Sequence, residues 1–252
     1  MEECTFRLAG VDEKLIDADL APGRAIAAIV ERQTEFILSY GGWSRRLPEG
    51  VRFPMIRILD QSRVLVADSR ADQCSKNAKV IDVGSGQETA FPAGDAIEEI
   101  VTFSDCVAVA YFDEAFGHEG LDGVVLFDLT GSRLWHDSFL DCYCACAQSP
   151  GHLLYLRYPG FELRQLDVAT RRVREWQIPE ALHGAAAMTS WGDTVFFHSP
   201  YDDPEGLLMW TLGAPQCQRF AEHPGRLRGL RGGRFLSTDE AECHELVVAD
   251  HV

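Results

Sequence analysis

The stretch YFDEAFGHEGLDG at 111–123 brings four carboxylates and an imidazole together among glycines. Carboxylate oxygens bind hard metal ions, and paired carboxyl groups perform acid–base catalysis, so either chemistry could arise in this stretch. The carboxylates are Asp113, Glu114, Glu119 and Asp122. They lack the alternating Asp and Asn positions and the closing Glu of a calcium-binding helical loop. We therefore predict no metal site from this stretch alone.

A second candidate for metal chemistry is CYCACAQ, in which Cys142, Cys144 and Cys146 alternate. Alternate residues of a strand point to one side of it, so three thiols would lie close together. Zinc ligands usually come as C-x-x-C pairs with a distant second pair, and the chain contains no C-x-x-C. We predict that these cysteines are buried and structural, because Cys packs as a small apolar residue where inner strands crowd together.

The motifs of several enzyme classes are absent from the sequence. The eight histidines show no H-x-H or H-E-x-x-H spacing. There is also no G-x-S-x-G, no phosphate-binding loop and no dinucleotide-binding glycine fingerprint. Hydrolase, kinase and dehydrogenase functions therefore lose their usual support, and we predict neither a cofactor nor a metal.

The charge of the chain restricts the class of partner. Its 252 residues include 39 acidic and 23 basic side chains, which gives a formal net charge of -16. This charge repels nucleic-acid phosphates and anionic lipids, and it complements a basic protein. The N-terminus has no basic stretch followed by an apolar run, and no membrane-spanning apolar segment occurs. We expect a cytoplasmic protein with reduced cysteines that is monomeric when free.

Short apolar segments bounded by Gly, Pro, Asp or Ser recur along the chain, and their β-branched and aromatic residues indicate an all-β fold. One strand-and-turn phrase repeats at 78–87, 123–132, 162–171 and 207–216. Its anchor residues, which are 46, 39 and 44 residues apart, are Asp82, Asp128, Asp167 and Thr211. A period of about 40 to 50 residues with four short strands per unit is typical of a β-propeller blade.

We predict a single β-propeller domain over residues 1–252, with six four-stranded blades. The last unit lacks its fourth strand before the chain ends, and ECTFRLA at 3–9 is a spare strand at the N-terminus. Pairing this strand with the last blade would close the ring and remove exposed sheet edges. An alternative remains for the first unit, because GRAIAAIVERQTEFIL at 23–38 could form an amphipathic helix. A helix there would leave five blades.

The phrase GVVLFDLTGSRLW at 123–135 resembles the blade repeat of bacterial β-propeller proteins of the quinoprotein-like and WD-like kind. In that repeat an apolar strand ends in Asp, a Thr-Gly turn follows, and an aromatic residue closes the next strand. The Gly-His and Trp-Asp dipeptides of WD repeats, the kelch double glycines and the sialidase Asp-box are absent at repeating positions. The resemblance implies the fold, and many functions share this fold.

In a propeller, the loop between the second and third strands of a blade emerges on the same face as the connections between blades. The stretch at 111–123 is such a loop, and its counterparts are 199–206 and 237–243. Together they hold ten carboxylates and no Lys or Arg, whereas turns predicted on the opposite face are more basic. We predict a partner-binding face made of Asp113, Glu114, Phe116, Glu119, Asp122, Tyr201, Asp202, Asp203, Glu205, Asp239, Glu240 and Glu242. Further aromatic candidates in or beside these loops are Phe112, Tyr158 and Phe161.

These observations favour a non-enzymatic propeller that uses an acidic, aromatic face to hold a basic protein. A small acidic protein without catalytic motifs is similar in character to bacterial immunity proteins, which neutralise cationic toxins such as nucleases. A toxin is therefore the predicted class of partner. The alternative is an enzyme of the propeller lactonase or glycosidase kind, with carboxylates at the central funnel. Its candidate residues are Asp95, Glu98, Asp141 and Glu180.

Overall fold

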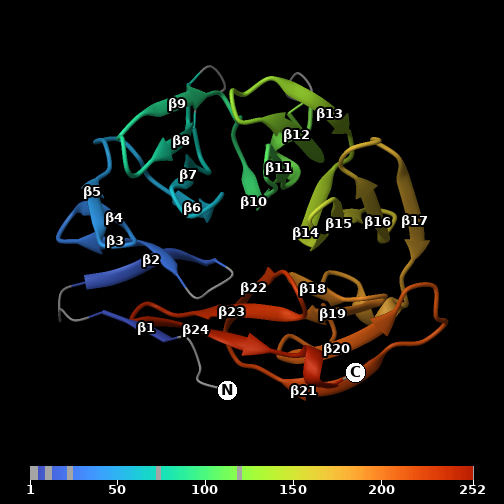
Figure 1. The fold of residues 1–252 in the computed structure, drawn as a ribbon. Coiled ribbons are helices and arrows are strands. Elements are labelled where there is room, and N and C mark those ends of the chain that lie inside the picture. The colour runs from blue at the N-terminus through green and yellow to red at the C-terminus, as the bar shows by residue number, and fades with distance from the viewer. Residues whose placement is uncertain (1–4, 9–12, 22–24, 72–74, 118–120, 252) are drawn as a thin grey trace.

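The computed structural model describes residues 5–8, 13–21, 25–71, 75–117 and 121–251. They form six four-stranded antiparallel sheets, arranged as blades around a central axis (Figure 1). In each blade the first strand lies nearest the axis and the fourth lies at the rim (Figure 1). The prediction of a six-bladed, all-β propeller is confirmed.

The first three blades follow one another along the chain. Blade 1 consists of β2 (Glu13–Leu20), β3 (Ile26–Arg32), β4 (Glu35–Tyr40) and β5 (Trp43–Arg46). Blade 2 consists of β6 (Pro54–Ile58), β7 (Arg63–Asp68), β8 (Ala78–Asp82) and β9 (Glu88–Phe91). Blade 3 consists of β10 (Ile97–Thr102), β11 (Cys106–Tyr111), β12 (Val124–Asp128) and β13 (Arg133–Asp137).

The remaining blades complete the ring. Blade 4 consists of β14 (Asp141–Ser149), β15 (His152–Tyr158), β16 (Glu162–Asp167) and β17 (Val173–Gln177). Blade 5 consists of β18 (Ala187–Trp191), β19 (Thr194–His198), β20 (Gly206–Thr211) and β21 (Gln218–Glu222). Blade 6 combines β22 (Arg226–Leu230), β23 (Arg234–Thr238) and β24 (Glu242–Val247) with the N-terminal β1 (Thr5–Arg7).

The ring closes as predicted, through the two ends of the chain. β1 pairs antiparallel with β24, with Thr5 opposite His244 and Arg7 opposite Glu242. The alternative of a helix at 23–38 is wrong, because the described part of this segment forms β3 and most of β4. Ala27, Ala28 and Ile29 are all fully buried, which is the environment of a strand covered on both faces and not of a half-exposed helix.

The repeated Asp of the sequence phrase has a local structural role at the end of the third strand. Asp128 accepts hydrogen bonds from Thr130 N, at 2.8 Å, and from Ser132 N, at 2.9 Å. Asp82 accepts one from Ser85 N, and Asp167 accepts one from Thr170 N. Each carboxylate thus satisfies the backbone of the turn into the fourth strand, as Asp commonly does in turns. These hydrogen bonds lower the pKa of all three carboxyl groups.

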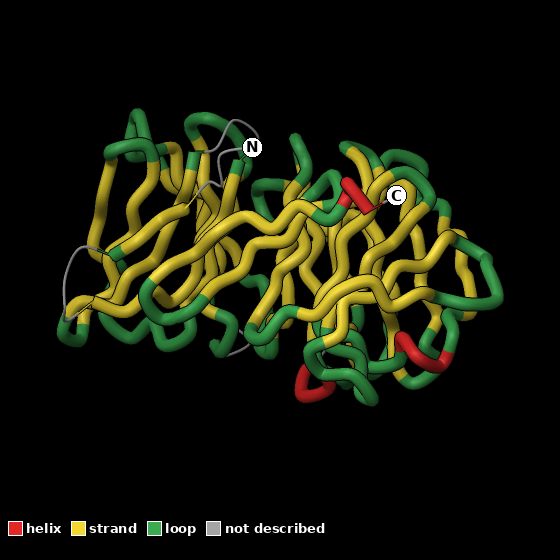
Figure 2. Tube along the Cα trace, turned by 90° about the horizontal axis from the view of Figure 1, so that it is seen from below, coloured by secondary structure: helices red, strands yellow, loops and turns green. Residues whose placement is uncertain are grey.

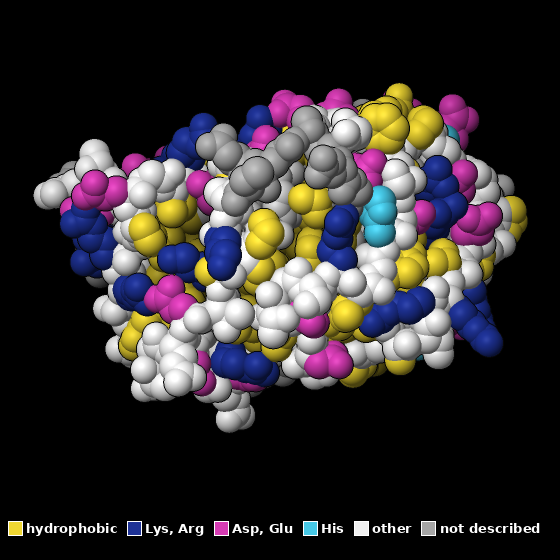
Figure 3. Space-filling view, turned by 90° about the horizontal axis from the view of Figure 1, so that it is seen from above, with side chains coloured by type: hydrophobic (Ala, Val, Ile, Leu, Met, Phe, Trp, Pro, Cys, Tyr) yellow, Lys and Arg dark blue, Asp and Glu magenta, His cyan; other side chains and the backbone are white. Residues whose placement is uncertain are grey.

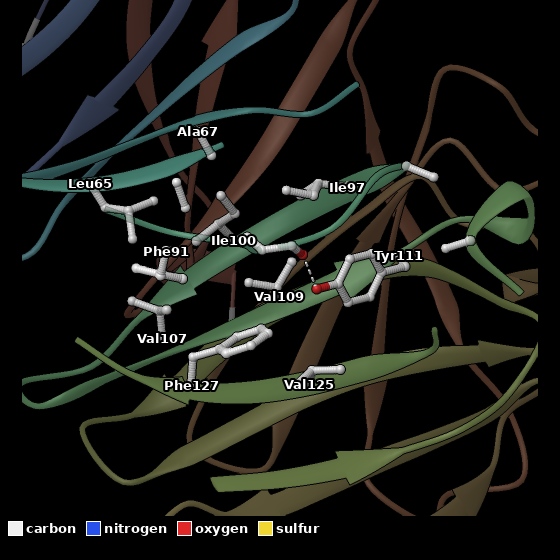
Figure 4. Packing of buried hydrophobic residues seen from close by; sticks show 14 of the residues in the cluster. Leu65, Ala67, Phe91, Ile97, Ile100, Val107, Val109, Tyr111, Val125 and Phe127 are labelled. Atoms are coloured by element: carbon white, nitrogen blue, oxygen red, sulfur yellow. Dashed lines mark hydrogen bonds between the residues drawn. The ribbon is translucent and has the colours of Figure 1, made fainter. Parts of the chain in front are cut away.

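The core lies between neighbouring blades, where the faces of adjacent sheets pack together. Between blades 2 and 3, Leu65 and Phe91 contact the face of blade 3 that includes Val109 and Phe127 (Figure 4). The buried Tyr111 hydroxyl donates a hydrogen bond to Ala93 O (Figure 4). Blades 5 and 6 approach so closely that a Cβ at Gly229 would lie 1.7 Å from Met188 O. Only glycine fits at that point.

The two faces of the disc carry different kinds of connection. Figure 2 shows the short helices η1 (Asp113–Ala115) and η2 (Glu180–Leu182) on one face and η3 (Ala249–His251) on the other. We call the face with η1 and η2 the loop face; it carries the connections between blades and the loops between second and third strands. The opposite hairpin face carries the tight turns between first and second strands and between third and fourth strands. No helix among the described residues is long and apolar enough to cross a membrane.

Candidate functional site

The loop face carries the three acidic loops singled out in the sequence. Asp113 and Glu114 form the start of η1, and Phe116 follows it with 53% of its surface exposed. Tyr201, 58% exposed, lies in the loop from β19 to β20, which also holds Asp202, Asp203 and Glu205. Asp239 and Glu240 lie in the turn from β23 to β24, and Glu242 is the first residue of β24. Glu119 lies outside the described residues.

Arginine and lysine side chains of the protein itself neutralise part of this acidic face. Glu114 pairs with Arg70 of blade 2. Asp203 lies 2.6 Å from Arg219, Glu240 lies 2.6 Å from Lys14, and Glu242 lies 2.5 Å from Arg7. These pairs are exposed, and such pairs contribute little to stability. Their consequence is that the four carboxylates offer a partner less charge than the sequence alone suggests.

Asp122 has a structural environment that differs from the other candidates. Its side chain is buried, its Oδ1 lies 2.6 Å from His136 Nε2, and its Oδ2 accepts a hydrogen bond from Ser138 Oγ at 2.8 Å. The neighbouring Gly123 has a φ of +59°, and a Cβ there would lie 2.2 Å from Asp137 O. Asp122 thus fixes the loop against blade 3, and we leave it out of the proposed binding surface.

Four further acidic candidates form no ion pair with the residues that the structure describes. Among the described residues, no Lys or Arg lies within salt-bridge distance of Asp113, Asp202, Glu205 or Asp239. Asp239 accepts hydrogen bonds from Ala241 N and Glu242 N, which lower the pKa of its carboxyl group and keep it ionised. The carboxylates that lack a Lys or Arg partner among the described residues therefore lie on the loops of blades 3, 5 and 6.

Five ring side chains gather on the loop face where blades 4 and 5 meet, and we call them the aromatic cluster. They are Tyr143, Tyr158, Phe161, His183 and Tyr201. The Phe161 ring is nearly parallel to the rings of Tyr143, at a centroid distance of 5.9 Å, and of His183, at 4.0 Å. The Tyr201 ring stands at 90° to that of Tyr143, and the two hydroxyls are hydrogen-bonded.

The backbone around the aromatic cluster is shaped to hold these rings. Phe161 has a φ of +53°, a conformation that side chains rarely adopt and that costs on the order of 1 kcal/mol or more. Gly184 has a φ of +72°, and a Cβ at this position would lie 2.3 Å from the Tyr201 ring. Tyr201 N also donates a hydrogen bond to His183 O at 3.0 Å. Phe161 is thus held in a strained backbone conformation, and the Tyr201 ring can lie where it does only because residue 184 is glycine.

Two carboxylates of the alternative enzymatic hypothesis, Glu98 and Asp141, lie in the inner strands β10 and β14 of neighbouring blades. The Glu98 side chain is exposed to solvent, but desolvation by the surrounding inner strands and repulsion from Glu99 and Asp141 raise its pKa to about 7, and Arg226 opposes this shift. Burial, with a contribution from Asp113, raises the pKa of Asp141 to about 6. Glu98 lines a cavity of about 180 Å³ that also includes Tyr143 and Arg226.

The other two carboxylates of that hypothesis have different surroundings. Asp95 accepts a hydrogen bond from Ala71 N at 3.0 Å and lies 3.5 Å from Arg70. Glu180 is the first residue of η2. Within the part of the chain that the structure describes, no three His, Cys, Asp or Glu residues are placed to hold a metal ion.

The three alternating cysteines do not share one side of their strand. A β-bulge between Cys142 and Cys144 in β14 shifts the register. Cys142 therefore packs between blades 3 and 4, whereas Cys144 and Cys146 pack between blades 4 and 5. All three are buried thiols, and burial raises the pKa of Cys146 to about 12. The sequence-based expectation of a shared side is wrong, and the prediction that these cysteines are buried is confirmed.

The basic side chains are less segregated than the sequence suggested. Arg45 and Arg46 lie in a rim strand that runs towards the loop face, where Arg46 lies 2.8 Å from Glu35. Arg45 pairs with Glu88 of the next blade. On the side of the disc where β9 and β13 lie, positive and negative side chains are interleaved (Figure 3). This side of the rim is thus mixed in charge.

Sequence reasoning did not assign two members of the aromatic cluster, Tyr143 and His183, to the partner-binding face. Tyr143 is the one bulky residue within CYCACAQ, which was a signal that this strand contributes more than small buried side chains. His183 is isolated in the sequence from every other histidine, so no spacing pattern could reveal it. Only the pairing of the blades brings these residues to Phe161 and Tyr201.

Comparison with known proteins supports the fold. No protein-family model and no curated protein matches the chain. A virginiamycin B lyase from Staphylococcus aureus superposes with a TM-score of 0.60 at 9% identity, over 98% of this chain and 99% of that one. A chain of a nidogen/laminin complex gives 0.59 at 14% identity, over 85% and 83%. A chain of a mitotic checkpoint complex gives 0.58 at 11% identity, over 97% and 94%.

These similar structures show the fold alone, since their sequence identity to this chain is so low. They include both a lyase and chains crystallised in protein complexes. The repeat resemblance seen in the sequence is thereby confirmed as a propeller, and the fold is compatible with both catalytic and binding roles.

Proposed function

We propose that the protein is a non-enzymatic binding module whose loop face holds a basic protein. The observation that carries the proposal is the aromatic cluster, in which Tyr201 is exposed but fixed by a ring contact and a hydrogen bond, with Asp202 beside it lacking a cation partner among the described residues. Aromatic side chains supply most of the affinity in many protein interfaces, and their faces attract Arg and Lys. The surrounding carboxylates would steer a cationic partner towards the cluster.

The proposed surface has two parts with different tasks. Its centre is the aromatic cluster, with Asp202 and Glu205 beside it in sequence. Its outer part consists of Asp113, Phe116 and Asp239 on the loops of blades 3 and 6. It also includes the carboxylates that form the ion pairs described above. A partner arginine or lysine could displace Arg219 from Asp203 at little cost, since such exposed pairs contribute about 0–1 kcal/mol.

Selection from a random peptide display library tests the function without knowledge of the natural partner. We expect the selected peptides to be enriched in Arg and Lys and to bind the wild-type protein. Tyr201→Ala and Asp202→Lys should weaken this binding, and hydrogen–deuterium exchange should show protection at residues 199–205. Selected peptides with no excess of positive charge, or protection confined to the hairpin face, would refute the proposal.

The same blade offers matched controls on the hairpin face. Trp191 is 55% exposed at the end of β18, and Asp193 lies in the turn that follows. Trp191→Ala removes an exposed ring, and Asp193→Lys reverses one charge, at the opposite end of blade 5. Both variants should bind the selected peptides as the wild type does.

We also propose that the natural partner is a cationic toxin domain and that the protein acts in the cytoplasm. The net charge of -16 and the thiol state of the described cysteines support this assignment. Co-expression with a basic protein encoded by an adjacent gene tests it. Wild-type protein should suppress the growth defect caused by that gene, and the Asp202→Lys variant should not. Equal growth with the wild type and with Asp202→Lys would exclude the toxin assignment. The binding function would then still be tested by the peptide experiment.

A second candidate function is acid–base hydrolysis at the inner edge of the loop face. It rests on Glu98, whose pKa of about 7 suits a general acid, next to the more acidic Asp141. The cavity at Glu98, of about 180 Å³, is smaller than the roughly 300–1,000 Å³ of ordinary small-molecule sites, which favours the binding function. Hydrolysis of lactones or chromogenic glycosides that disappears in Glu98→Gln would support the enzyme. Equal rates in both proteins would exclude it.

A further inference from the structure

Two cavities lie along the axis of the propeller, one towards each face. The smaller, already described, lies towards the loop face, and the larger, of about 570 Å³, opens towards the hairpin face. Four residues line both of them: Arg57, Glu99, Arg228 and Gly229. The side chains of Arg57, Glu99 and Arg228 therefore form a layer of charge between the two cavities. We call the larger cavity the hairpin-face chamber.

Most cations of the hairpin-face chamber are matched by carboxylates. Arg57, which is fully buried, lies 2.7 Å from Asp17 and 2.5 Å from Glu99. Arg228 lies 2.5 Å from Asp19. A further lining arginine, Arg234, lies 2.6 Å from Glu245. The positive charge of these three arginines is therefore internally compensated.

Arg231 is the exception among the lining arginines. It is half-buried in the turn between β22 and β23, and its Nη2 donates a hydrogen bond to Thr102 O at 2.8 Å. Its guanidinium lies 5.7 Å from the centroid of the Phe103 ring. Among the described residues, no carboxylate is within salt-bridge distance of it, and no acceptor is within hydrogen-bond distance of its Nε or Nη1.

The environment of Arg231 removes part of the solvent from its charge. Burial lowers the pKa of its guanidinium from the ordinary value, although the nearby Asp19 opposes the shift. Because the residue is only half-buried and lines the hairpin-face chamber, its remaining donors are open to a ligand in the chamber. The backbone holds the residue firmly in place, since Arg231 forms a parallel bridge with Ser190 of blade 5.

The rest of the chamber wall has an apolar part and a polar part. Its larger apolar side chains come from blades 1, 2, 3 and 6 and include Leu20, Ile58, Leu59, Val101, Phe103 and Leu230. Its polar residues are Tyr40, Asp60, Gln61, Thr102 and Ser104. A volume of about 570 Å³ falls within the range of about 300–1,000 Å³ that is usual for small-molecule sites. A ligand that fits this wall would carry one negative charge on an apolar body.

We propose that the hairpin-face chamber binds a small organic monoanion, a carboxylic acid with an apolar body, whose carboxylate pairs with Arg231. A carboxylate accepts two parallel hydrogen bonds from a guanidinium, one from Nη2 and one from either Nε or Nη1. Thr102 O accepts from one of the two N–H groups of Arg231 Nη2, so the other N–H group and its neighbouring donor are available for the carboxylate. A single negative charge fits better than two, because Asp19 lies close enough to act on Arg231 and would repel a dianion. This site is independent of the proposed protein-binding function, which uses the other face.

Calorimetric titration of the purified protein with hexanoate, octanoate and benzoate tests the site, with the corresponding neutral amides as controls. A charge-assisted hydrogen bond contributes about 1.5–3 kcal/mol, so we expect at least one acid to bind roughly 10- to 100-fold more tightly than its amide. Arg231→Gln should abolish this preference, and Arg231→Lys should keep part of it because the charge remains. The melting temperature of each variant reports whether the fold is retained.

Matched controls separate this site from general charge effects and from the loop face. Arg172→Gln removes a positive charge from another turn of the hairpin face, and Tyr201→Ala alters the aromatic cluster. Neither should change acid binding. Failure of all three acids to bind, equal binding of acid and amide, or unchanged acid binding in Arg231→Gln would overturn the proposal.

Discussion

The Phe161 ring stacks on the imidazole of His183, with the ring centroids 4.0 Å apart and the planes at 7° to each other. Phe161 belongs to blade 4, and His183 lies in the connection that leads to blade 5. The contact thus joins two blades at the surface, and Tyr201 is fixed against it by its own backbone hydrogen bond to His183 O. A binding surface that is ordered in advance loses less conformational entropy when a partner arrives.

Removal of the exposed ring of the aromatic cluster should weaken binding strongly and stability weakly. Tyr201→Ala should reduce the affinity for a selected cationic peptide by about 10- to 100-fold, as expected for a residue at the centre of an interface. The melting temperature should fall only slightly, because more than half of the Tyr201 surface is already exposed. Fluorescence anisotropy and calorimetry measure the two effects. A variant with unchanged affinity would show that the cluster is only structural.

Gly184 provides a test that leaves every ring in place. In Gly184→Ala the new Cβ would lie 2.3 Å from the Tyr201 ring, so the ring must move out of the aromatic cluster. Peptide affinity should fall as it does in Tyr201→Ala. Gly192→Ala is the matched control, because Gly192 also has a positive φ, of +59°, but a Cβ there meets no atom within 4 Å. If both variants lose affinity equally, backbone strain rather than ring position is the cause.

Stability should depend on pH through Glu98. Its pKa in the folded protein is about 7, above the ordinary value of 4.5, so the folded state binds more protons than the unfolded state between these values. Stability from this group is therefore present below about pH 4.5 and is lost as the pH rises to about 7. We therefore compare the melting temperature of Glu98→Gln with that of the wild type at each pH. The difference, variant minus wild type, should be more positive at about pH 8 than at about pH 5. The same difference at both pH values would show that folding does not raise the pKa of Glu98.

The charged layer between the two axial cavities should be sensitive to the loss of one member. Arg57→Met leaves Asp17 and Glu99 without their cation, and removal of one partner of a buried pair costs about 3–5 kcal/mol. Urea unfolding of the variant measures this loss. Adding Asp17→Asn and Glu99→Gln to Arg57→Met should recover much of the stability, because no unpaired charge then remains. A triple variant no more stable than the single one would point to lost packing instead.

The fold was largely predictable from the sequence, because the repeated phrase contains the physical cause of the repeat. Asp82, Asp128 and Asp167 are visible as anchors since each caps the same turn at the end of a third strand. The closing strand was predictable for a similar reason: the last unit lacked one strand, and the N-terminus had one to spare. Each of these features depends on residues that are close together in the chain, so a single sequence is enough to recognise it.

The site was less predictable, because its geometry depends on contacts between distant residues. Arg70 and Arg219 neutralise Glu114 and Asp203 only after the chain has folded, and no pattern near those carboxylates indicates it. The β-bulge that separates Cys142 from Cys144 is likewise set by pairing with β15. His183 reaches Phe161 through the stacking of one blade on the next.

The central claim, that the loop face binds a basic protein, is tested most directly by calorimetric titration of two charge variants with a selected cationic peptide. Asp202→Lys and Asp193→Lys change the net charge equally, at opposite faces of blade 5. In about 50 mM salt, Asp202→Lys should lose at least about 10-fold in affinity while Asp193→Lys matches the wild type, and about 300 mM salt should narrow the gap. Equal affinity of the two variants would contradict the account.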